Sequence, residues 1–146
     1  MRFKAGGQSV IRKGKGKKLA IIASYGGGIK AWKKAGYFNR TRRYYKKFAE
    51  EFSQIFYITY DRESTEVGRQ AKVLTNPGIP NFLYSLFLPF IHARYLCNVD
   101  IITTTQLFGA WPSILAKFLF GHPLVIRTEY EWSRFEKKHQ IGLSLF

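Results

Sequence analysis

The sequence predicts an α/β fold in which a parallel β-sheet is covered by helices on both faces. From Lys18 onward, strand-like and helix-like segments alternate, an order that gives right-handed crossovers between parallel strands. The first strand-like segment, Leu19–Ser24, runs directly into Gly26-Gly27-Gly28. The last includes Leu124–Ile126, which is apolar without alternation, as expected for a strand covered on both faces. Together these features predict a Rossmann-like, doubly wound sheet.

The composition fits one packed domain with a strongly basic surface. The chain has 146 residues, of which 46% are hydrophobic, enough for one core. We expect the basic, glycine-rich residues 1–16 to form a flexible tail and residues 17–146 to form a Rossmann-like domain. The chain carries 24 Lys and Arg against 9 Asp and Glu, a formal net charge of +15. This excess favours an anionic partner, which could be a phosphate compound, a lipid head group or nucleic acid.

Cysteine, histidine and hydropathy patterns narrow the class of protein. The single cysteine, Cys97, excludes an internal disulfide, suits a reducing cytoplasm and is expected in the core. His92, His122 and His139 lack partners at useful spacing, so we expect them to be structural and predict no metal site. The most apolar segment, Phe82–Ile91, is shorter than the roughly 20 residues that cross a bilayer as a helix. It is expected to be a buried or interfacial helix.

The segments that follow the first strand have clear local signatures. Basic and aromatic residues alternate over Asn39–Phe52 and predict a helix with a cationic face and an aromatic face. Ile55–Tyr60 is rich in aromatic and β-branched residues and predicts a strand. The polar segment Asp61–Gln70 predicts a loop, and Lys72–Thr75 predicts a short strand.

Helix-like and strand-like segments also alternate in the second half of the sequence. An apolar helix is predicted over Asn81–Leu96, because Pro80 stands where a first helical turn accepts proline. Pro89 should kink this helix or split it in two. Gly121 is expected to end the next helix in a left-handed conformation. The remaining segments predict, in order, the strand Asp100–Thr104, the helix Ala110–Leu119 and the strand Pro123–Thr128.

Four segments, taken in order, indicate a resemblance to a known protein family. They are Lys18–Gly28, the helix with Arg40, Arg42, Arg43, Tyr44 and Tyr45, the segment Val99–Pro112, and the segment Gly121–Glu129. Together they resemble the N-terminal domain of family 4 GT-B glycosyltransferases over about residues 17–135.

The resemblance implies one half of a two-domain enzyme. Proteins of that family join two Rossmann-like domains, with the acceptor held mainly by the first and the nucleotide sugar mainly by the second. The chain is similar to the first domain only, and we expect it to be incomplete. The resemblance further implies retention of anomeric configuration without a required metal, a nucleotide-sugar donor for the complete enzyme and no cofactor on this chain. Catalysis would need a missing C-terminal donor-binding domain or a partner subunit, so the chain alone is expected to be inactive.

The glycine turn has two interpretations. Gly26, Gly27 and Gly28 permit positive φ angles and let backbone amides approach an anion. However, the turn matches neither the dinucleotide fingerprint nor a Walker A loop, and about ten residues separate it from the predicted helix, which disfavours NAD and ATP. It either lines a ligand, as the resemblance implies, or only changes the chain direction. The same loop contains Lys30, Trp32, Lys33 and Lys34. These residues either cover a sugar or phosphate or form a basic surface.

Polar residues follow the last two predicted strands, where an open α/β sheet binds its ligands. The candidate acceptor-binding residues are Thr103, Thr104, Thr105 and Gln106, with Trp111 as a stacking surface, and Arg127 after the last strand. By resemblance, Glu129 stands where many family members carry a histidine that contacts the donor sugar or the acceptor. A carboxylate there could act as a catalytic base or bind sugar hydroxyls. Alternatively, Glu129 pairs with Arg127 or caps the following turn.

The basic residues of the first long predicted helix have a structural and a functional interpretation. Arg40, Arg42, Arg43, Lys46 and Lys47 form either a solvated face or, with the tail and the apolar helix, a surface for anionic lipid. The second interpretation suits a sugar or lipid-linked acceptor at the cytoplasmic membrane face, where the protein would be peripheral. The alternatives are a noncatalytic acceptor-binding subunit and a basic nucleic-acid-binding module. We disfavour nucleic acid because the sequence has no helix-turn-helix, RNP signature or zinc finger.

Overall fold

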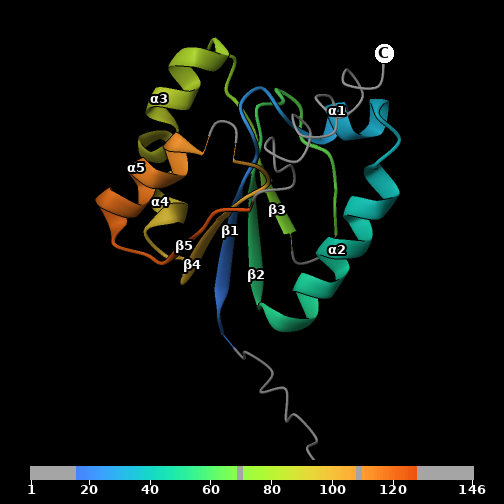
Figure 1. Cartoon of the computed structure of the whole chain (residues 1–146), viewed down its shortest axis with the longest axis horizontal. Coiled ribbons are helices and arrows are strands. Elements are labelled where there is room, and N and C mark those ends of the chain that lie inside the picture. Colours follow the sequence, from blue (N-terminus) through green and yellow to red (C-terminus); the bar gives the residue numbers. More distant parts are fainter. Residues whose placement is uncertain (1–15, 69–70, 108–109, 128–146) are drawn as a thin grey trace, which may run out of the picture.

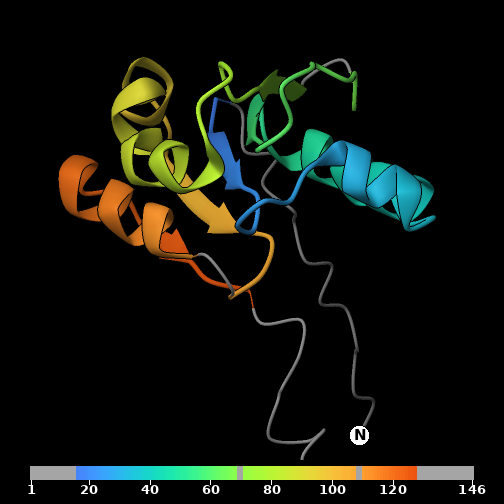
Figure 2. The ribbon, with the colours of Figure 1, turned by 90° about the horizontal axis from the view of Figure 1, so that it is seen from above.

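One five-stranded sheet organises the chain in the computed structural model, which describes residues 16–68, 71–107 and 110–127. All the strand pairs are parallel. The strands are β1 (Lys18–Ile22), β2 (Gln54–Ile58), β3 (Ala71–Leu74), β4 (Ile101–Thr104) and β5 (Leu124–Val125). The helices are α1 (Ile29–Lys34), α2 (Phe38–Glu51), α3 (Asn81–Ile91), α4 (Ala93–Leu96) and α5 (Trp111–Phe120). Helices α1 and α2 cover one face of the sheet, and α3, α4 and α5 cover the other (Figures 1 and 2), so the predicted doubly wound fold is confirmed.

The strand order creates a switch point in the middle of the sheet. The order is β3-β2-β1-β4-β5, so the chain first runs outward from β1 to β3 and then returns to start β4 beside β1. Leu19 aligns with Ile101 and Ile22 aligns with Thr104 across this central pair. The loops after β1 and β4 therefore leave the same edge of the sheet in opposite directions. Open α/β sheets bind ligands outside the carboxyl ends of the strands at such a point.

The neighbouring strands β1 and β2 explain why the sheet forms. Residues 19–22 of β1 and 55–58 of β2 are all buried, at 4% exposure or less. They are continuous apolar runs because helices cover both faces of the sheet and leave no solvent-facing side. β-Branched and aromatic side chains fill positions 21–22 and 55–58, as strand propensity favours. Their burial makes this part of the sheet the core of the domain.

An aromatic cluster holds α1 and α2 against the sheet. It consists of Trp32 from α1, Tyr45 from α2 and Tyr57 from β2, whose ring centroids lie 5.3 to 6.2 Å apart. Such spacings are typical of favourable tilted or edge-to-face aromatic pairs. Phe48 and Phe52 continue the apolar side of α2 onto the core. The cluster fixes the position of α2 over the centre of the sheet.

One helix was not predicted, and this corrects the interpretation of the glycine turn. We expected a loop of about ten residues after Gly28, but α1 begins directly at Ile29. Trp32 is therefore a helical residue that packs on the core. The helix has only six residues, too few to show a repeating apolar pattern in the sequence.

The predicted apolar helix is split, as Pro89 suggested. Helix α3 ends at Ile91, and the short helix α4 begins after His92. Proline has no amide hydrogen, so Pro89 cannot donate to the carbonyl group of Ser85, one turn earlier. The predicted left-handed end of α5 is also confirmed, because Gly121 has φ +72° and donates its amide hydrogen to the Lys117 carbonyl group.

His92 is structural, as expected. Its Nε2 atom lies 2.8 Å from the Tyr84 hydroxyl oxygen, and both side chains are buried. Burial lowers the pKa of His92 from 6.5 to about 4. The imidazole is therefore neutral at physiological pH and serves as a hydrogen-bond partner inside the helical layer.

Two expectations for the layer of α3, α4 and α5 were wrong. Cys97 is exposed instead of lying in the core. The basic helix and Phe82–Ile91 were expected to share one surface, but α2 and α3 lie on opposite faces of the sheet (Figure 2). In the described part of the chain, no helix has the length and apolar character needed to cross a bilayer.

Candidate functional site

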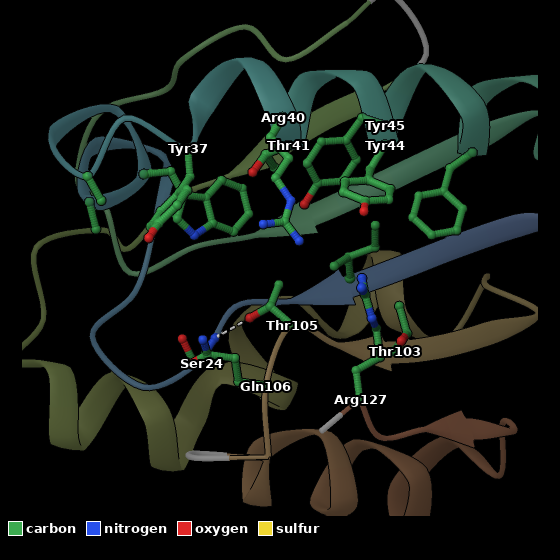
Figure 3. A pocket seen from close by; sticks show the side chains of 15 residues that line it. Ser24, Tyr37, Arg40, Thr41, Tyr44, Tyr45, Thr103, Thr105, Gln106 and Arg127 are labelled. Atoms are coloured by element: carbon green, nitrogen blue, oxygen red, sulfur yellow. Dashed lines mark hydrogen bonds between the residues drawn. The ribbon is translucent and has the colours of Figure 1, made fainter. Parts of the chain in front are cut away.

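A cavity of about 360 Å³ lies at the switch point, on the side of the sheet that α1 and α2 cover. Its floor comes from the ends of three neighbouring strands: Ser24 follows β1, Thr105 and Gln106 follow β4, and Arg127 follows β5. Helix α2 faces these residues across the cavity (Figure 3). The fold thus places the cavity where sheets of this type bind ligands.

Threonine side chains fix the floor of the cavity. The Ser24 amide donates to Thr105 Oγ1 over 2.9 Å, and the Arg127 amide donates to Thr104 Oγ1 over 3.2 Å. Thr103 Oγ1 donates to the Val125 carbonyl oxygen over 3.0 Å. These bonds join the end of β4 to the ends of β1 and β5. The Thr105 hydroxyl accepts from Ser24 and keeps its own hydrogen for donation to a ligand.

Helix α2 supplies an aromatic and hydroxyl-rich wall. Tyr45 is buried, and burial raises the pKa of its hydroxyl, while the positive charge of Arg127 acts in the opposite direction. The phenol therefore remains a neutral group. Tyr44 is exposed at the rim, where the Arg40 guanidinium carbon lies 5.9 Å from its ring centroid. The wall thus offers both ring faces and hydrogen-bonding groups to a ligand.

The charged groups of the cavity are basic. Arg40 and Arg127 line it, and no acidic side chain does so among the described lining residues. Figure 3 shows the two side chains reaching toward the same space, Arg40 from α2 and Arg127 from the end of β5. Arg40 and Arg127 therefore give the described part of the lining its positive charge.

The glycine turn lies outside the cavity, and contacts within the chain explain its composition. The Gly27 amide donates to the Ser24 carbonyl, and the Gly27 carbonyl accepts the Tyr60 amide. A Cβ atom at Gly28 would overlap the Asp61 carboxylate and Thr59 Oγ1. The same carboxylate accepts the Lys30 amide over 3.1 Å at the start of α1. The chain's own Asp61 therefore occupies the place where the sequence suggested an anionic ligand.

The structure brings together about half of the predicted ligand-binding residues. Those that line the cavity are Trp32, Thr103, Thr105, Gln106 and Arg127, whereas Gly26, Gly27, Gly28 and Thr104 do not. Trp111 begins α5 on the other face of the sheet (Figure 2) and does not line it either. Glu129 and the predicted tail, apart from Gly16, lie outside the described residues.

Several lining residues were not predicted. Arg40 was assigned to a cationic surface, and the prediction omitted its neighbours on the same side of α2, Tyr37, Thr41, Tyr44, Tyr45 and Phe48. Their spacing of three, four and seven residues marks one side of a helix and was visible in the sequence. The other predicted basic residues of α2, Arg42, Arg43, Lys46 and Lys47, are exposed and do not line the cavity.

Metal binding and similarity to known proteins give no further assignment. Within residues 16–68, 71–107 and 110–127, no three His, Cys, Asp or Glu side chains gather as possible metal ligands. Comparisons with protein-family models, curated proteins and solved structures find no match.

Proposed function

We propose that the chain is the acceptor-side domain of a GT-B glycosyltransferase, which moves a sugar from a nucleotide-sugar donor to a glycan or lipid-linked acceptor. The observation that carries the proposal is the cavity at the switch point, lined by residues from the ends of β1, β4 and β5. All four segments that resemble the glycosyltransferases contribute residues to this cavity. Fold, position and resemblance thus support the same site.

The lining chemistry suits a sugar. Sugar hydroxyl groups need donors and acceptors, and the floor offers both in Ser24, Thr105 and Gln106. The less polar faces of a sugar ring need apolar surface, which Trp32 and Tyr44 supply on the other side. A volume of about 360 Å³ lies within the range of pockets for small ligands. The cavity is therefore large enough for a small sugar.

Sugar transfer requires a second component in this proposal. The donor would be bound by a C-terminal domain or by a partner subunit, and the transfer would retain anomeric configuration. Glu129 follows Arg127 by two residues in the sequence, and it remains the candidate base that the resemblance suggests. A noncatalytic acceptor-binding subunit would use the same cavity and differs only in whether its partner supplies donor chemistry.

The proposal includes peripheral contact with an anionic membrane at the cytoplasmic face. The outer sides of α3 and α5 expose large apolar side chains, among them Phe82, Phe87, Phe90, Ile114 and Phe118. Residues 81–99 and 110–127 contain no acid, and their basic residues include Arg94 and Lys117. Exposed aromatic residues among basic ones fit an anionic lipid interface. Such contact would bring a lipid-linked acceptor to the domain.

The test is sugar binding by the 146-residue chain. We would use saturation-transfer NMR with a panel of monosaccharides and their phosphates, and repeat it with Gln106→Ala. Loss of the Gln106 amide should weaken sugar binding roughly tenfold, while Asn98→Ala, at the other end of β4, should leave it unchanged. Failure of every sugar to bind, with binding of single-stranded or duplex DNA at matched salt, would instead favour a nucleic-acid-binding module.

A further inference from the structure

The switch-point cavity continues past its rim into a second hollow on the outer side of α2. This hollow has a volume of about 340 Å³ and is lined by Asn39, Arg40, Arg43, Tyr44 and Lys47. Arg40 and Tyr44 also line the cavity, so the two spaces share one wall. Figure 3 shows both side chains on the side of α2 that faces the cavity floor. A ligand that fills the cavity can therefore extend along α2 while it stays in contact with the protein.

The residues that lead from the cavity along α2 are basic. Arg40, Arg43 and Lys47 are spaced by three and four residues, which places them on one side of a helix. All three are exposed, and the helical rise separates Arg40 from Lys47 by roughly 10 Å along the axis. The described lining of the hollow contains no Asp or Glu. These three residues, which we call the α2 track, form a row of positive charges that begins at the cavity.

The stability of α2 does not explain the α2 track. Basic residues three or four positions apart repel each other and weaken a helix. The helix dipole favours acids near the N-terminus and bases near the C-terminus. Helix α2 has no acid in its first turn and no base in its last turn, and it ends with Glu50 and Glu51. Between described residues, the one ion pair joins Lys30 to Glu63, so it neutralises no member of the track. An anionic ligand would balance these charges.

We infer that the acceptor is an acidic oligosaccharide, whose terminal sugar occupies the switch-point cavity and whose repeated carboxylate or phosphate groups follow the α2 track. This inference rests on the proposed function, because it specifies the acceptor of the same site. Arginine and lysine bind both kinds of anion, and arginine does so with two parallel hydrogen bonds. The exposed ring of Tyr44 lies where the two spaces meet and adds apolar surface for a sugar ring.

The observations favour a sugar polymer over other polyanions. The α2 track is continuous with a cavity whose floor presents Ser24, Thr105 and Gln106 to hydroxyl groups. A lipid bilayer suits this surface less well, because α2 packs Tyr45 and Phe48 against the core instead of presenting an apolar face for insertion. Nucleic acid would use the charges without the cavity, so the experiment compares it directly.

The experiment titrates the full chain with galacturonic acid and its oligomers, and with neutral maltooligosaccharides of the same lengths. Phosphomannan fragments provide the phosphate arm, and oligothymidylate provides the nucleic-acid arm. The variants are Arg40→Gln and Lys47→Gln, with Lys46→Gln as the matched control. Lys46 is the exposed neighbour of Lys47 and carries the same charge, but it lines a different hollow, on the side of α2 toward β3. Circular dichroism would verify that each variant is folded.

We expect one acidic series to bind more tightly as its length increases, and its longest member to bind at least tenfold more tightly than the neutral oligomer of equal length. Lys47→Gln should weaken binding of that acidic oligomer roughly 3- to 10-fold, and Arg40→Gln roughly tenfold or more. Lys46→Gln should leave it within about twofold. Lys47→Gln should leave binding of the single sugar unchanged, because Lys47 does not line the cavity. The series that shows this pattern identifies carboxylate or phosphate as the repeated group.

Other outcomes separate the inference from the proposed function. Equal affinity for acidic and neutral oligosaccharides would overturn the inference and leave the proposed function standing, since a sugar would still bind. Equal losses in Lys46→Gln and Lys47→Gln would show a general charge effect and overturn the inference. Oligothymidylate that binds as tightly as the acidic oligosaccharide, with the same dependence on Lys47, would replace it with nucleic acid. Failure of every sugar to bind would refute the proposed function itself.

Discussion

Acidification from pH 7 to pH 5 is expected to destabilise the folded chain through His92. The ring is buried beside the Tyr84 hydroxyl, and burial lowers its pKa from 6.5 to about 4. The unfolded chain therefore takes up a proton near pH 6.5, whereas the folded chain resists it until about pH 4. The stability that neutral His92 contributes is complete above the unfolded pKa and is lost as the pH falls toward the folded pKa.

The pKa difference sets the size of the effect. A lowering from 6.5 to about 4 corresponds to roughly 3 kcal/mol over the whole titration. Applying the linkage relation between pH 7 and pH 5 assigns about 2 kcal/mol of this loss to that interval. Lys30 lowers the pKa of the Glu63 carboxyl through their hydrogen bond and charge.

Urea unfolding at pH 7, 6 and 5 would measure the effect in the native chain and in His92→Gln. Glutamine does not titrate, so the variant keeps every other pH-dependent contribution and loses only that of residue 92. The native chain should lose about 2 kcal/mol more than the variant between pH 7 and pH 5. Identical pH dependence in the two proteins would refute the assignment of this loss to buried His92.

Three other changes test packing and surface contacts. Gly28→Ala should reduce the unfolding free energy by about 1–3 kcal/mol, because the added methyl group has no room beside the end of β2. Gly68→Ala meets no atom within 4 Å and should change it by less than about 1 kcal/mol, so equal effects in urea melts would contradict the packing account. Asn76→Ala should cost about 2–4 kcal/mol, since the buried side chain bonds three backbone groups before α3; a loss below about 1 kcal/mol in thermal melts would show that these bonds matter little. Phe87→Ser should weaken binding to phosphatidylglycerol vesicles roughly tenfold, whereas Tyr44→Ser, on the other face of the sheet, should have a smaller effect; the reverse order in a flotation assay would move the lipid contact to α2.

The fold was predictable where burial imposes a strong pattern. β1 and β2 are covered on both faces, so their sequences are continuous apolar runs. Runs of this kind are typical of buried parallel strands. Proline and glycine marked the division of the apolar helix and the end of α5 because each changes the backbone directly. Helix α1 was missed because its six residues are mostly exposed and show no repeat.

The candidate site was predictable only where topology alone determines position. Thr105, Gln106 and Arg127 follow strands, and parallel strands bring their ends to one edge of the sheet. The contribution of Arg40 depends on how α2 lies over the switch point, which the packing of Trp32, Tyr45 and Tyr57 sets. The sequence shows that the lining residues of α2 share one side of the helix. It does not show that this side lies over β4.

Backbone amide chemical-shift mapping of a bound sugar 1-phosphate tests the central claim, that the cavity at the switch point is the acceptor site. The account predicts the largest shifts at Ser24, Thr105 and Gln106 and along α2 around Arg40, with little change in α3. Shifts confined to the glycine turn at Gly26–Gly28 or to the helical layer of α3 and α5 would contradict it.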